Sequence, residues 1–449
     1  MQLTIVGGGG FRTPLVFQQL VADARRLIDR VVLVDSSPDR LAVVAAVLDG
    51  VAEGRWAPEV RTTTDLHAGL RGADFVFAAI RPGGLDGRVH DENIPLRHDV
   101  LGQETVGLGG ILYALRSLPA MRAVGEAVAD VAPSAWLINF TNPAGMVTES
   151  LQEVLPGRVI GICDSPAALV RRACRALRVA EPDVEIDYVG LNHLGWLRAL
   201  RVGGADLLPG LIAGDAITGF EEGQLFGASL IRALGTIPNE YLHYFYYAAD
   251  VVESLRATTS RASFLREQQS AFYREAAEAA TAGAPYAAWR RVVDERNRTY
   301  MAVAREAAGA AERAEEDVEG GGYEQIALAV MRAIAHDTGE RLILDVPNRR
   351  SGAAVLDALD IDAVIEIPCT VGKDGATPAT VAPLSDHEAG LIRQVKAVER
   401  WTITAALDGS RDALHAAIAT HPLNGSYPRA VRIVDEWLTH FPDVAARLS

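Results

Sequence analysis

A cysteine and an aspartate stand side by side in the stretch VIGICDSPAAL, where an apolar run ends before a proline. Cys163 is one of three cysteines in 449 residues, and Asp164 follows it directly. A thiolate and an imidazole can hold a divalent cation, and His193 lies in a later apolar segment, VGLNHLGW. Two protein ligands leave positions for substrate or water, so such a site would be catalytic. The alternative is that both are ordinary core residues.

A run of tyrosines in the stretch GTIPNEYLHYFYY offers a candidate base. Tyr241 begins this run. A phenol has a reference pKa of about 10 and therefore needs a nearby cation to ionise it. A metal at Cys163 and His193 would meet that need. The near-helical spacing of the tyrosines is equally typical of a core or an interface.

The elements that must position these residues form an alternating pattern in the first two hundred residues. Near-continuous apolar runs are separated by segments with helical spacing, which predicts a parallel sheet covered on both faces, a doubly wound α/β domain. Such sheets bind ligands at the carboxyl ends of their strands. The predicted strands are 3–7, 30–35, 74–80, 135–141 and 158–163, with helices at 14–29 and 114–131 between them.

The stretch IVGGGGFRTP follows the first predicted strand and opens the first helix. Glycines in this context let the backbone approach a pyrophosphate at a helix N-terminus. The third glycine of the usual fingerprint is replaced by Arg12, but Asp35 ends the second strand, where an acid suits the ribose hydroxyls of NAD. The alternative is a turn that only lets strand and helix pack. The predicted NAD contacts are Gly7, Gly8, Gly9, Gly10, Asp35 and Arg40.

The character of the chain changes after about residue 200, where Ala- and Glu-rich helical stretches dominate. Strand-like runs recur only in RLILDV and DAVIEI. We therefore expect an NAD-binding Rossmann-like domain over 1–200 and a mixed, mainly helical α+β substrate domain over 201–449.

Composition excludes several classes of partner. The formal net charge of −15 and the lack of clustered Lys and Arg argue against nucleic acid. No run approaches the ~18 apolar residues of a spanning helix, and no signal peptide precedes the first strand, so we expect no membrane partner and a cytoplasmic location.

Several motifs together resemble glycoside hydrolase family 4, the NAD- and metal-dependent glycosidases that include 6-phospho-α- and 6-phospho-β-glucosidases. The resemblance runs over nearly the whole chain. The motifs are VGGGG with TP at the start, RPGGLDGRVHDENIPLRHDVLGQETVGLGG, NFTNPAG, GICDSP, GLNHLGW, IPNEYLHYFYY and VPNRRSG. It implies a lactate/malate dehydrogenase-like sheet, and homodimers or homotetramers by family habit.

The resemblance also implies roles for particular residues. Cys163 and His193 would bind Mn²⁺ or another divalent metal, and Tyr241 would remove the proton from C2 of the sugar. Asp164 would assist the leaving group, and Glu104 would make the tyrosine more basic. The residues that match substrate-contacting positions are Arg88, Asn142 and Arg261.

The chemistry that the resemblance implies proceeds by oxidation at C3, loss of the C2 proton, elimination of the aglycone, addition of water and return of the hydride to C3. NAD is thus unchanged overall. Such enzymes do not need the usual pair of carboxylates.

Two positions depart from the family pattern and leave the substrate open. Gly10 and Arg12 stand where phosphosugar-cleaving members usually carry a serine and an aromatic residue, so Arg12 pairs with a phosphate, marks another substrate or lies on the surface. Asp164 is commoner among α-cleaving members, whereas the general run of the sequence favours the 6-phospho-β-glucosidase branch, which we expect. The alternatives are a 6-phospho-α-glucosidase or other α-glycosidase, an NAD-dependent sugar or hydroxyacid dehydrogenase, and a non-catalytic sensor.

Overall fold

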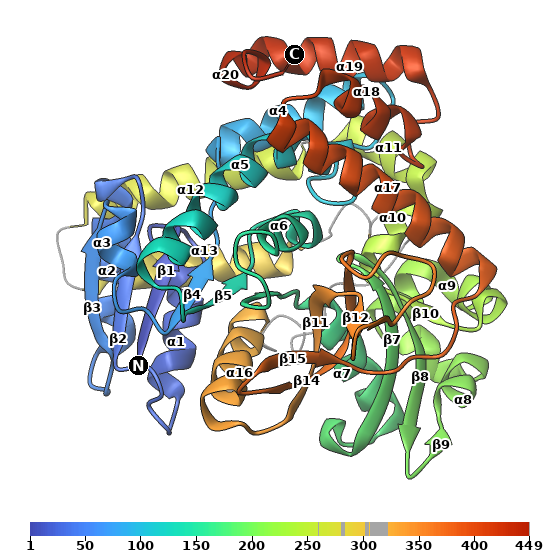
Figure 1. The fold of residues 1–449 in the computed structure, drawn as a ribbon, viewed down its shortest axis with the longest axis horizontal. Coiled ribbons are helices and arrows are strands. Elements are labelled where there is room, and N and C mark those ends of the chain that lie inside the picture. Colours follow the sequence, from blue (N-terminus) through green and yellow to red (C-terminus); the bar gives the residue numbers. More distant parts are fainter. Residues whose placement is uncertain (259, 280–282, 301–304, 306–321, 449) are drawn as a thin grey trace.

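A computed structural model describes residues 1–258, 260–279, 283–300, 305 and 322–448. Most of its described strands join one 13-stranded sheet that extends across the molecule, with helices packed against it (Figure 1). These strands are β1 (Gln2–Val6), β2 (Arg30–Val34), β3 (Glu59–Thr63), β4 (Phe75–Ala78), β5 (Trp136–Asn139), β6 (Val159–Gly161), β7 (Val184–Leu191), β8 (Leu194–Val202), β9 (Ala205–Asp206), β10 (Ile237–Pro238), β11 (Glu340–Pro347), β14 (Val364–Gly372) and β15 (Gly375–Pro378). Strands β12 (Arg349–Arg350) and β13 (Ala353–Ala354) pair separately.

The described helices lie between these strands and beyond them. They are α1 (Thr13–Ala22), α2 (Pro38–Ala52), α3 (Leu66–Leu70), α4 (Gly84–Arg97), α5 (Leu108–Val131), α6 (Ala144–Leu151), α7 (Ser165–Leu177), α8 (Leu208–Ala213), α9 (Glu221–Leu234), α10 (His243–Tyr246), α11 (Ala248–Ala257), α12 (Arg261–Ala277), α13 (Ala284–Arg298), α16 (Tyr323–His336), α17 (Asp386–Asp408), α18 (Arg411–Thr420), α19 (Tyr427–His440) and α20 (Pro442–Ala445). Short 3₁₀ turns add η1 (Glu181–Asp183), η2 (Asp215–Gly219) and η3 (Glu240–Leu242).

The N-terminal half of the sheet is parallel and has the strand order β3-β2-β1-β4-β5-β6. This is the order of dinucleotide-binding folds, and it confirms the predicted doubly wound sheet. Strands β1, β2 and β6 all point the same way, so the residues that follow them meet at one edge. The glycine turn follows β1, Asp35 follows β2, and Cys163 follows β6.

The edge strand β3 was not predicted from the sequence. Its residues, EVRTT, are mostly exposed or half-buried and lack the apolar run that marked the other strands. It pairs with β2 from Arg30 opposite Glu59 to Val34 opposite Thr63. An edge strand can leave much of its surface exposed to solvent, so a polar composition is compatible with its place in the sheet. For the same reason it lacks the apolar run from which the other strands were predicted.

The two strand-like runs of the second half, β11 and β14, join the same sheet. Strand β11 pairs antiparallel with β6, and β14 pairs antiparallel with both β11 and β7. The sheet therefore passes from the parallel strands through residues 340–372 and back to β7 and β8. The division of the chain near residue 200 stays a prediction.

Helices from the second half cover the edge where the strands end. Helices α12 and α13 pack against each other, and both pack on α2. Trp289 of α13 is fully buried, and its indole nitrogen donates a hydrogen bond to the carbonyl of Phe11, 2.9 Å away, just after the glycine turn. Residues of α12 and α13 are thereby brought over the carboxyl end of β1.

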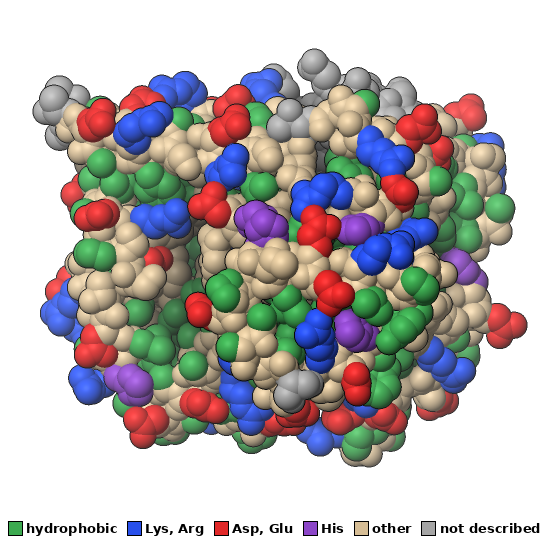
Figure 2. Space-filling view, turned by 90° about the horizontal axis from the view of Figure 1, so that it is seen from above, with side chains coloured by type: hydrophobic (Ala, Val, Ile, Leu, Met, Phe, Trp, Pro, Cys, Tyr) green, Lys and Arg blue, Asp and Glu red, His purple; other side chains and the backbone are tan. Residues whose placement is uncertain are grey.

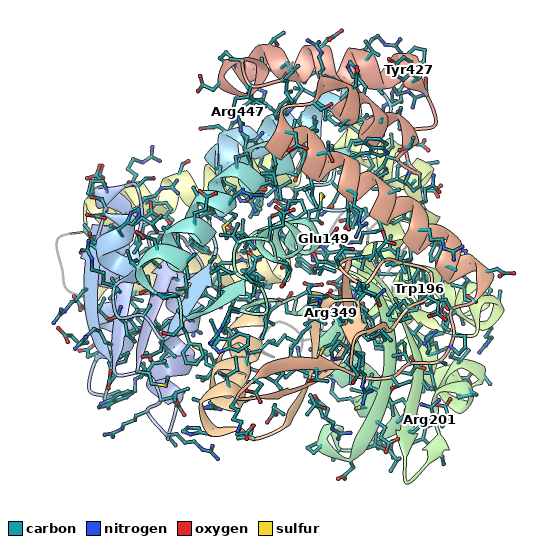
Figure 3. The ribbon with its side chains drawn as sticks, in the orientation of Figure 1. Glu149, Trp196, Arg201, Arg349, Tyr427 and Arg447 are labelled. Atoms are coloured by element: carbon teal, nitrogen blue, oxygen red, sulfur yellow. The ribbon has the colours of Figure 1, made fainter. Side chains whose placement is uncertain are left out.

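Helix α17, the first of the last four helices of the chain, packs against α5 and α6. The buried Lys396 Nζ lies 2.7 Å from Glu149 Oε2, and Figure 3 shows Glu149 near the centre of the molecule. Helix α17 begins with a capping box formed by Ser385 and Glu388, which satisfies backbone N–H groups at its start.

Asp345 on β11 and Glu366 on β14 are cross-strand partners in the core. Burial, together with the charge of Glu399, raises the pKa of Asp345 from 3.8 to about 8. The folded protein therefore keeps a proton that the unfolded chain loses. The stabilisation from this proton is fully present below the unfolded pKa and is lost as the pH rises toward 8.

Replacing Asp345 with asparagine is expected to flatten the fall in melting temperature between about pH 5 and 8, because the side chain no longer ionises. Thermal unfolding across this range measures the effect. Asp362→Asn is the control, since Arg400 lowers the pKa of that exposed carboxyl and it stays ionised throughout. An unchanged slope in Asp345→Asn would contradict the prediction.

The surface view in Figure 2 shows Lys and Arg side chains interspersed with Asp and Glu, without a broad basic patch on that face. In the part of the chain that the structure describes, no helix is long and apolar enough to cross a membrane.

Candidate active site

The glycine turn after β1 is closely fitted to its neighbours. The amides of Gly7 and Gly8 both donate to the carbonyl of Val34 at 2.8 Å. Gly7 has a positive φ of 91°, and a Cβ there would lie 2.5 Å from the carbonyl oxygen of Ala79. Only glycine fits such a position. Gly7 and Gly10 of this turn line the cavity described below.

The predicted NAD contacts are brought together around this turn. Asp35 Oδ2 accepts a hydrogen bond from the Gly9 amide at 3.1 Å. The Arg40 guanidinium lies 4.7 Å from the centre of the Tyr273 ring, and the Tyr273 hydroxyl donates to the Gly9 carbonyl at 2.7 Å. Tyr273 comes from α12 and was missed in the sequence, because its segment shows only ordinary helical spacing.

A cavity of about 1730 Å³ lies over the edge where β1, β2 and β6 end. Its lining includes Gly7, Gly10, Asp35 and Arg40. Pockets for a single drug-sized ligand usually measure about 300–1,000 Å³. The space is therefore large enough for a dinucleotide together with a second small molecule. The remaining predicted site residues that line it are Arg88, Glu104, Asn142, Cys163, Asp164, His193, Tyr241 and Arg261.

Cys163 lies two residues beyond the end of β6 and is buried, with its Sγ 3.2 Å from the Ser165 hydroxyl. Burial, followed by the charges of Glu366 and Asp164, raises the pKa of the thiol well above its usual value. A divalent cation would reverse this effect, because coordination favours the thiolate.

His193 occupies the turn between β7 and β8 with a left-handed φ of 63° and is also buried. Burial lowers the pKa of its imidazole to about 4, so the ring is neutral at pH 7. Among the described residues, Nδ1 has no hydrogen-bond partner. A buried, neutral nitrogen without a partner is chemically suited to bind a metal.

The donors in this region fit an open metal site. Cys163 and His193 supply one sulfur and one nitrogen to the same cavity. Within the described ranges, no group of three or more His, Cys, Asp or Glu side chains is arranged to hold a metal. Two protein donors leave the remaining positions for substrate or water, as expected of a catalytic centre.

Tyr241 lies on η3 with its ring stacked on that of His193, at a centroid distance of 3.9 Å and an interplanar angle of 18°. Burial, followed by the charge of Glu240, raises the pKa of the phenol well above its usual value. The tyrosine therefore needs nearby positive charge before it can act as a base. Its hydroxyl lies 3.0 Å from that of Tyr300, which was missed in the sequence.

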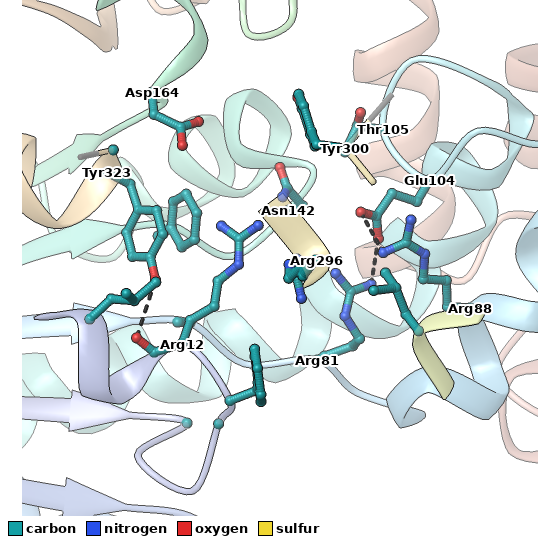
Figure 4. Close-up of a pocket in the computed structure, with 18 of the residues that line it drawn as sticks. Arg12, Arg81, Arg88, Glu104, Thr105, Asn142, Asp164, Arg296, Tyr300 and Tyr323 are labelled. Atoms are coloured by element: carbon teal, nitrogen blue, oxygen red, sulfur yellow. Dashed lines mark hydrogen bonds and ion pairs between the residues drawn. The ribbon is translucent and has the colours of Figure 1, made fainter. Parts of the chain in front are cut away.

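Glu104 is held by two arginines, Arg81 and Arg88, in the cavity (Figure 4). Its two oxygens lie 2.7 Å from Arg81 Nη1 and 2.9 Å from Arg88 Nη1. Burial raises the pKa of Glu104, but these two ion pairs outweigh it and lower the pKa to about 2. Arg88 also donates to Glu92 at 2.7 Å. The predicted effect of Glu104 on Tyr241 stays a prediction.

Further arginines gather in the middle of the cavity. Figure 4 shows Arg296 between Arg12 on one side and the Arg81, Glu104 and Arg88 group on the other. Arg12 is stacked over Phe140 and Tyr323, at 5.2 and 5.0 Å from their ring centres. It lines the cavity and is therefore not a surface residue.

The guanidinium groups of Arg261 and Arg296 are both buried near other positive charges, which lowers their pKa values. Burial and the charge of Arg88 lower the pKa of Arg261 to about 10. Burial, followed by repulsion from Arg12, Arg261 and Arg88, lowers the pKa of Arg296 well below its usual value. Arg296 was missed because ERNRTY has the composition of an exposed helix end. Only the packing of α13 over the sheet directs it inward.

A glycine turn in a doubly wound sheet, an acid after the second strand and a large cavity at the strand ends are typical of dinucleotide-dependent enzymes. The model of the family 4 glycosyl hydrolases matches residues 2–179, and the model of the family 4 glycosyl hydrolase C-terminal domain matches residues 188–424. The chain belongs to family 4 of the glycosyl hydrolases, as its motifs predicted.

Relatives within this family cleave both anomers. The chain is 31% identical to a 6-phospho-alpha-glucosidase of Leptotrichia buccalis, over 97% of this chain and 96% of that protein. It is 28% identical to a 6-phospho-beta-glucosidase of Escherichia coli K12, over 100% of this chain and 98% of that protein.

Solved structures agree with the fold. A 6-phospho-beta glucosidase from Thermotoga maritima, solved with manganese, NAD+ and glucose-6-phosphate, has a TM-score of 0.80 at 25% identity and covers 99% of each chain. A lactate dehydrogenase from a deep-sea metagenome has a TM-score of 0.53 at 14% identity, covering 90% of this chain and 98% of that one. This second likeness shows the fold alone, and confirms that the sheet is of the lactate dehydrogenase type.

Proposed function

We propose that this chain hydrolyses 6-phosphoglucosides, with NAD and Mn²⁺ or another divalent metal as cofactors. The observation that carries this proposal is the Arg296 guanidinium. It lies in the cavity among other arginines, and no carboxylate of the described residues forms an ion pair with it. Gathering like charges in a buried site is costly unless an anion joins them.

A sugar phosphate would offset this cost. A phosphate monoester carries a charge of about −1.5 to −2 and three strong acceptor oxygens. Guanidinium groups match these oxygens with paired hydrogen bonds. Arg12, Arg261 and Arg296 supply such groups in place of the serine that is absent at Gly10. The relatives that cleave phosphoglucosides support the same assignment.

The residues present fit both cofactors. The glycine turn, Asp35 and Arg40 would hold NAD, and Cys163 and His193 would hold the metal. When bound, the nicotinamide supplies a reversible oxidation at C3, and the metal supplies charge stabilisation at the sugar oxygens. The chain's own groups bind and orient the sugar and move its protons.

Particular side chains take the following roles in this proposal. Tyr241 removes the proton from C2, with its ring held against His193. Asp164, which follows Cys163 and lines the cavity, donates a proton to the leaving oxygen. Glu104 holds Arg88 in place. The predicted substrate contacts are Arg88, Asn142 and Arg261.

For the anomer, we propose an α-linked substrate. Asp164 is the residue commoner among α-cleaving members, and the relative at 31% identity is a 6-phospho-alpha-glucosidase. The β-linked substrate expected from the sequence is the competing candidate, supported by the relative at 28% identity. A cytoplasmic location and a homodimeric or homotetrameric state stay predictions.

The proposal is tested by nitrophenol release from α- and β-glucosides, each with and without a 6-phosphate, with NAD and Mn²⁺ omitted in turn. We expect cleavage of the 6-phosphorylated α-glucoside only when both cofactors are present, with the amount of NAD unchanged. The matched non-phosphorylated glucoside should react at least about 100-fold more slowly, because several charge-assisted hydrogen bonds are lost.

Other outcomes would identify the competing functions. Net formation of NADH without release of nitrophenol would identify a dehydrogenase. Binding of NAD without either reaction would identify a sensor. Equal cleavage of phosphorylated and non-phosphorylated glucosides would overturn the assignment of a phosphate to the arginines.

A further inference from the structure

The hydroxyl of Tyr300 lies between two groups of η3. It is 3.0 Å from the hydroxyl of Tyr241 and 2.8 Å from Glu240 Oε1. A phenol has one proton to donate and lone pairs with which to accept. Tyr300 can therefore accept from one neighbour while it donates to the other. The contact joins the residue just beyond α13 to the residue that stacks on His193.

Glu240, the second neighbour of Tyr300, is itself fixed in the core. It is 3% exposed, and its Oε2 lies 3.2 Å from Arg172 Nη2. Arg172, on α7, also donates from Nε to Glu222 Oε2 at 3.0 Å. Because α7 begins at Ser165, directly after Cys163 and Asp164, this chain of contacts ties the Tyr300 hydroxyl to the element that carries the predicted metal ligand.

We infer that Tyr300 is a positioning residue for Tyr241, holding the Tyr241 oxygen in place through a hydrogen bond that Glu240 and Arg172 in turn hold fixed. The inference rests on the proposed function, in which Tyr241 takes the C2 proton. Nothing in the sequence motifs of the family resemblance includes Tyr300.

Two features make this contact suited to that task. The stack on His193 fixes the plane of the Tyr241 ring, but a stack alone leaves the ring free to slide. A hydrogen bond at the phenol oxygen removes that freedom and sets where the oxygen meets the sugar. The Tyr300 hydroxyl has a single proton, which it gives to Glu240 while it accepts from a neutral Tyr241. When Tyr241 is a phenolate, the same proton turns to the charged oxygen instead, and hydrogen bonds to charged groups are the stronger kind.

The segment that carries Tyr300 also touches the arginines. Thr299 Oγ1 accepts a hydrogen bond from Arg261 Nη1 at 2.8 Å, and Arg261 Nη2 donates to the Arg296 carbonyl at 3.1 Å. The end of α13 is therefore in contact both with the groups proposed to bind the phosphate and with the proposed base. A sugar bound by its phosphate would have its reacting carbons set against Tyr241 by the same segment.

The test is Tyr300→Phe, which removes one oxygen and keeps the ring. We expect kcat on the phosphoglucoside to fall about 10- to 100-fold, as for loss of a hydrogen bond to a charged group. KM should stay within about twofold, because the hydroxyl acts after the substrate is bound. The isotope effect on kcat from deuterium at C2 should be at least as large as in the wild type, since proton removal is the step slowed.

Tyr247→Phe is the matched control. The Tyr247 hydroxyl donates a hydrogen bond of 2.7 Å to the Phe226 carbonyl, close in sequence to η3 but outside the cavity. We expect this variant to keep the wild-type kcat and isotope effect. The NAD affinity, measured by fluorescence titration, and the melting temperature should be the same in the two variants.

The inference and the proposed function fail in different ways. If the wild type releases no aglycone from any phosphoglucoside, the proposed function fails. If the wild type cleaves but Tyr300→Phe matches Tyr247→Phe in kcat, only the inference is overturned. A Tyr300→Phe protein that loses NAD binding together with kcat, or shows a smaller C2 isotope effect, also overturns it, since the hydroxyl would then serve the fold or another step.

Discussion

Replacing His193 with alanine is expected to lower the NAD- and Mn²⁺-dependent hydrolysis of the phosphoglucoside by at least about 10²- to 10³-fold, the usual cost of removing one preorganised electrostatic group. The neutral imidazole, with its unpartnered Nδ1, is the nitrogen donor that the cavity offers to a metal. Its loss also removes the surface on which the Tyr241 ring is stacked. The expected change lies mainly in kcat.

Two measurements separate metal binding from general damage. Mn²⁺ affinity, measured by electron paramagnetic resonance, should fall in His193→Ala, while NAD affinity stays near that of the wild type, because the glycine turn and Asp35 are untouched. The matched control is His243→Ala. His243 is also buried with a pKa lowered to about 4 by burial, but it does not line the cavity. Unchanged Mn²⁺ affinity in His193→Ala would contradict the ligand assignment.

Replacing Arg296 with methionine is expected to lower kcat/KM on the 6-phosphorylated substrate by about 10- to 100-fold, as for loss of charge-assisted hydrogen bonds. Activity on the non-phosphorylated glucoside, although low, should change little. Methionine keeps most of the apolar stem of arginine, so packing is largely preserved. The loss should lie mainly in KM, because the phosphate is bound equally before and during the reaction.

The control for this variant is Arg291→Met on the same helix. Arg291 pairs with Glu275 at 2.6 Å on the surface and does not line the cavity. We expect it to leave both activities unchanged. If Arg296→Met lowered kcat/KM equally on the phosphorylated and the non-phosphorylated glucoside, Arg296 would serve the fold of the site and not phosphate recognition.

Much of the parallel half of the fold could be predicted from the sequence. The apolar runs at 3–7, 30–35 and 158–163 correspond to β1, β2 and β6, because these strands are buried on both faces apart from Arg30 and are therefore mainly apolar. The polar edge strand β3 escaped this reasoning for the opposite reason. The runs in β11 and β14 were predicted as strands. A hydrophobic pattern indicates that a strand is buried, but it does not indicate which strand pairs with it in the sheet.

Some residues of the candidate site could likewise be predicted from the sequence, and others could not. Residues that sit at the ends of predicted strands, such as Asp35, Cys163 and Asp164, were found because parallel strands carry their last residues to one edge. Tyr273, Arg296 and Tyr300 were not found. They lie on or next to α12 and α13, whose sequences are typical of ordinary surface helices.

By itself, the sequence determined the doubly wound sheet, the glycine turn with its acid, the family to which the chain belongs and the donor types near the strand ends. These are local properties, set by apolar patterning and by short motifs whose residues must be close along the chain. Only the tertiary structure decided which strands join the sheet from the second half and which arginines and tyrosines face the cavity. The inward direction of these side chains depends on how α12 and α13 pack over the strand ends, where Trp289 donates a hydrogen bond to the carbonyl of Phe11 after the glycine turn. Such long-range packing, like the pairing of distant strands, leaves no periodic mark in the segments that it brings together.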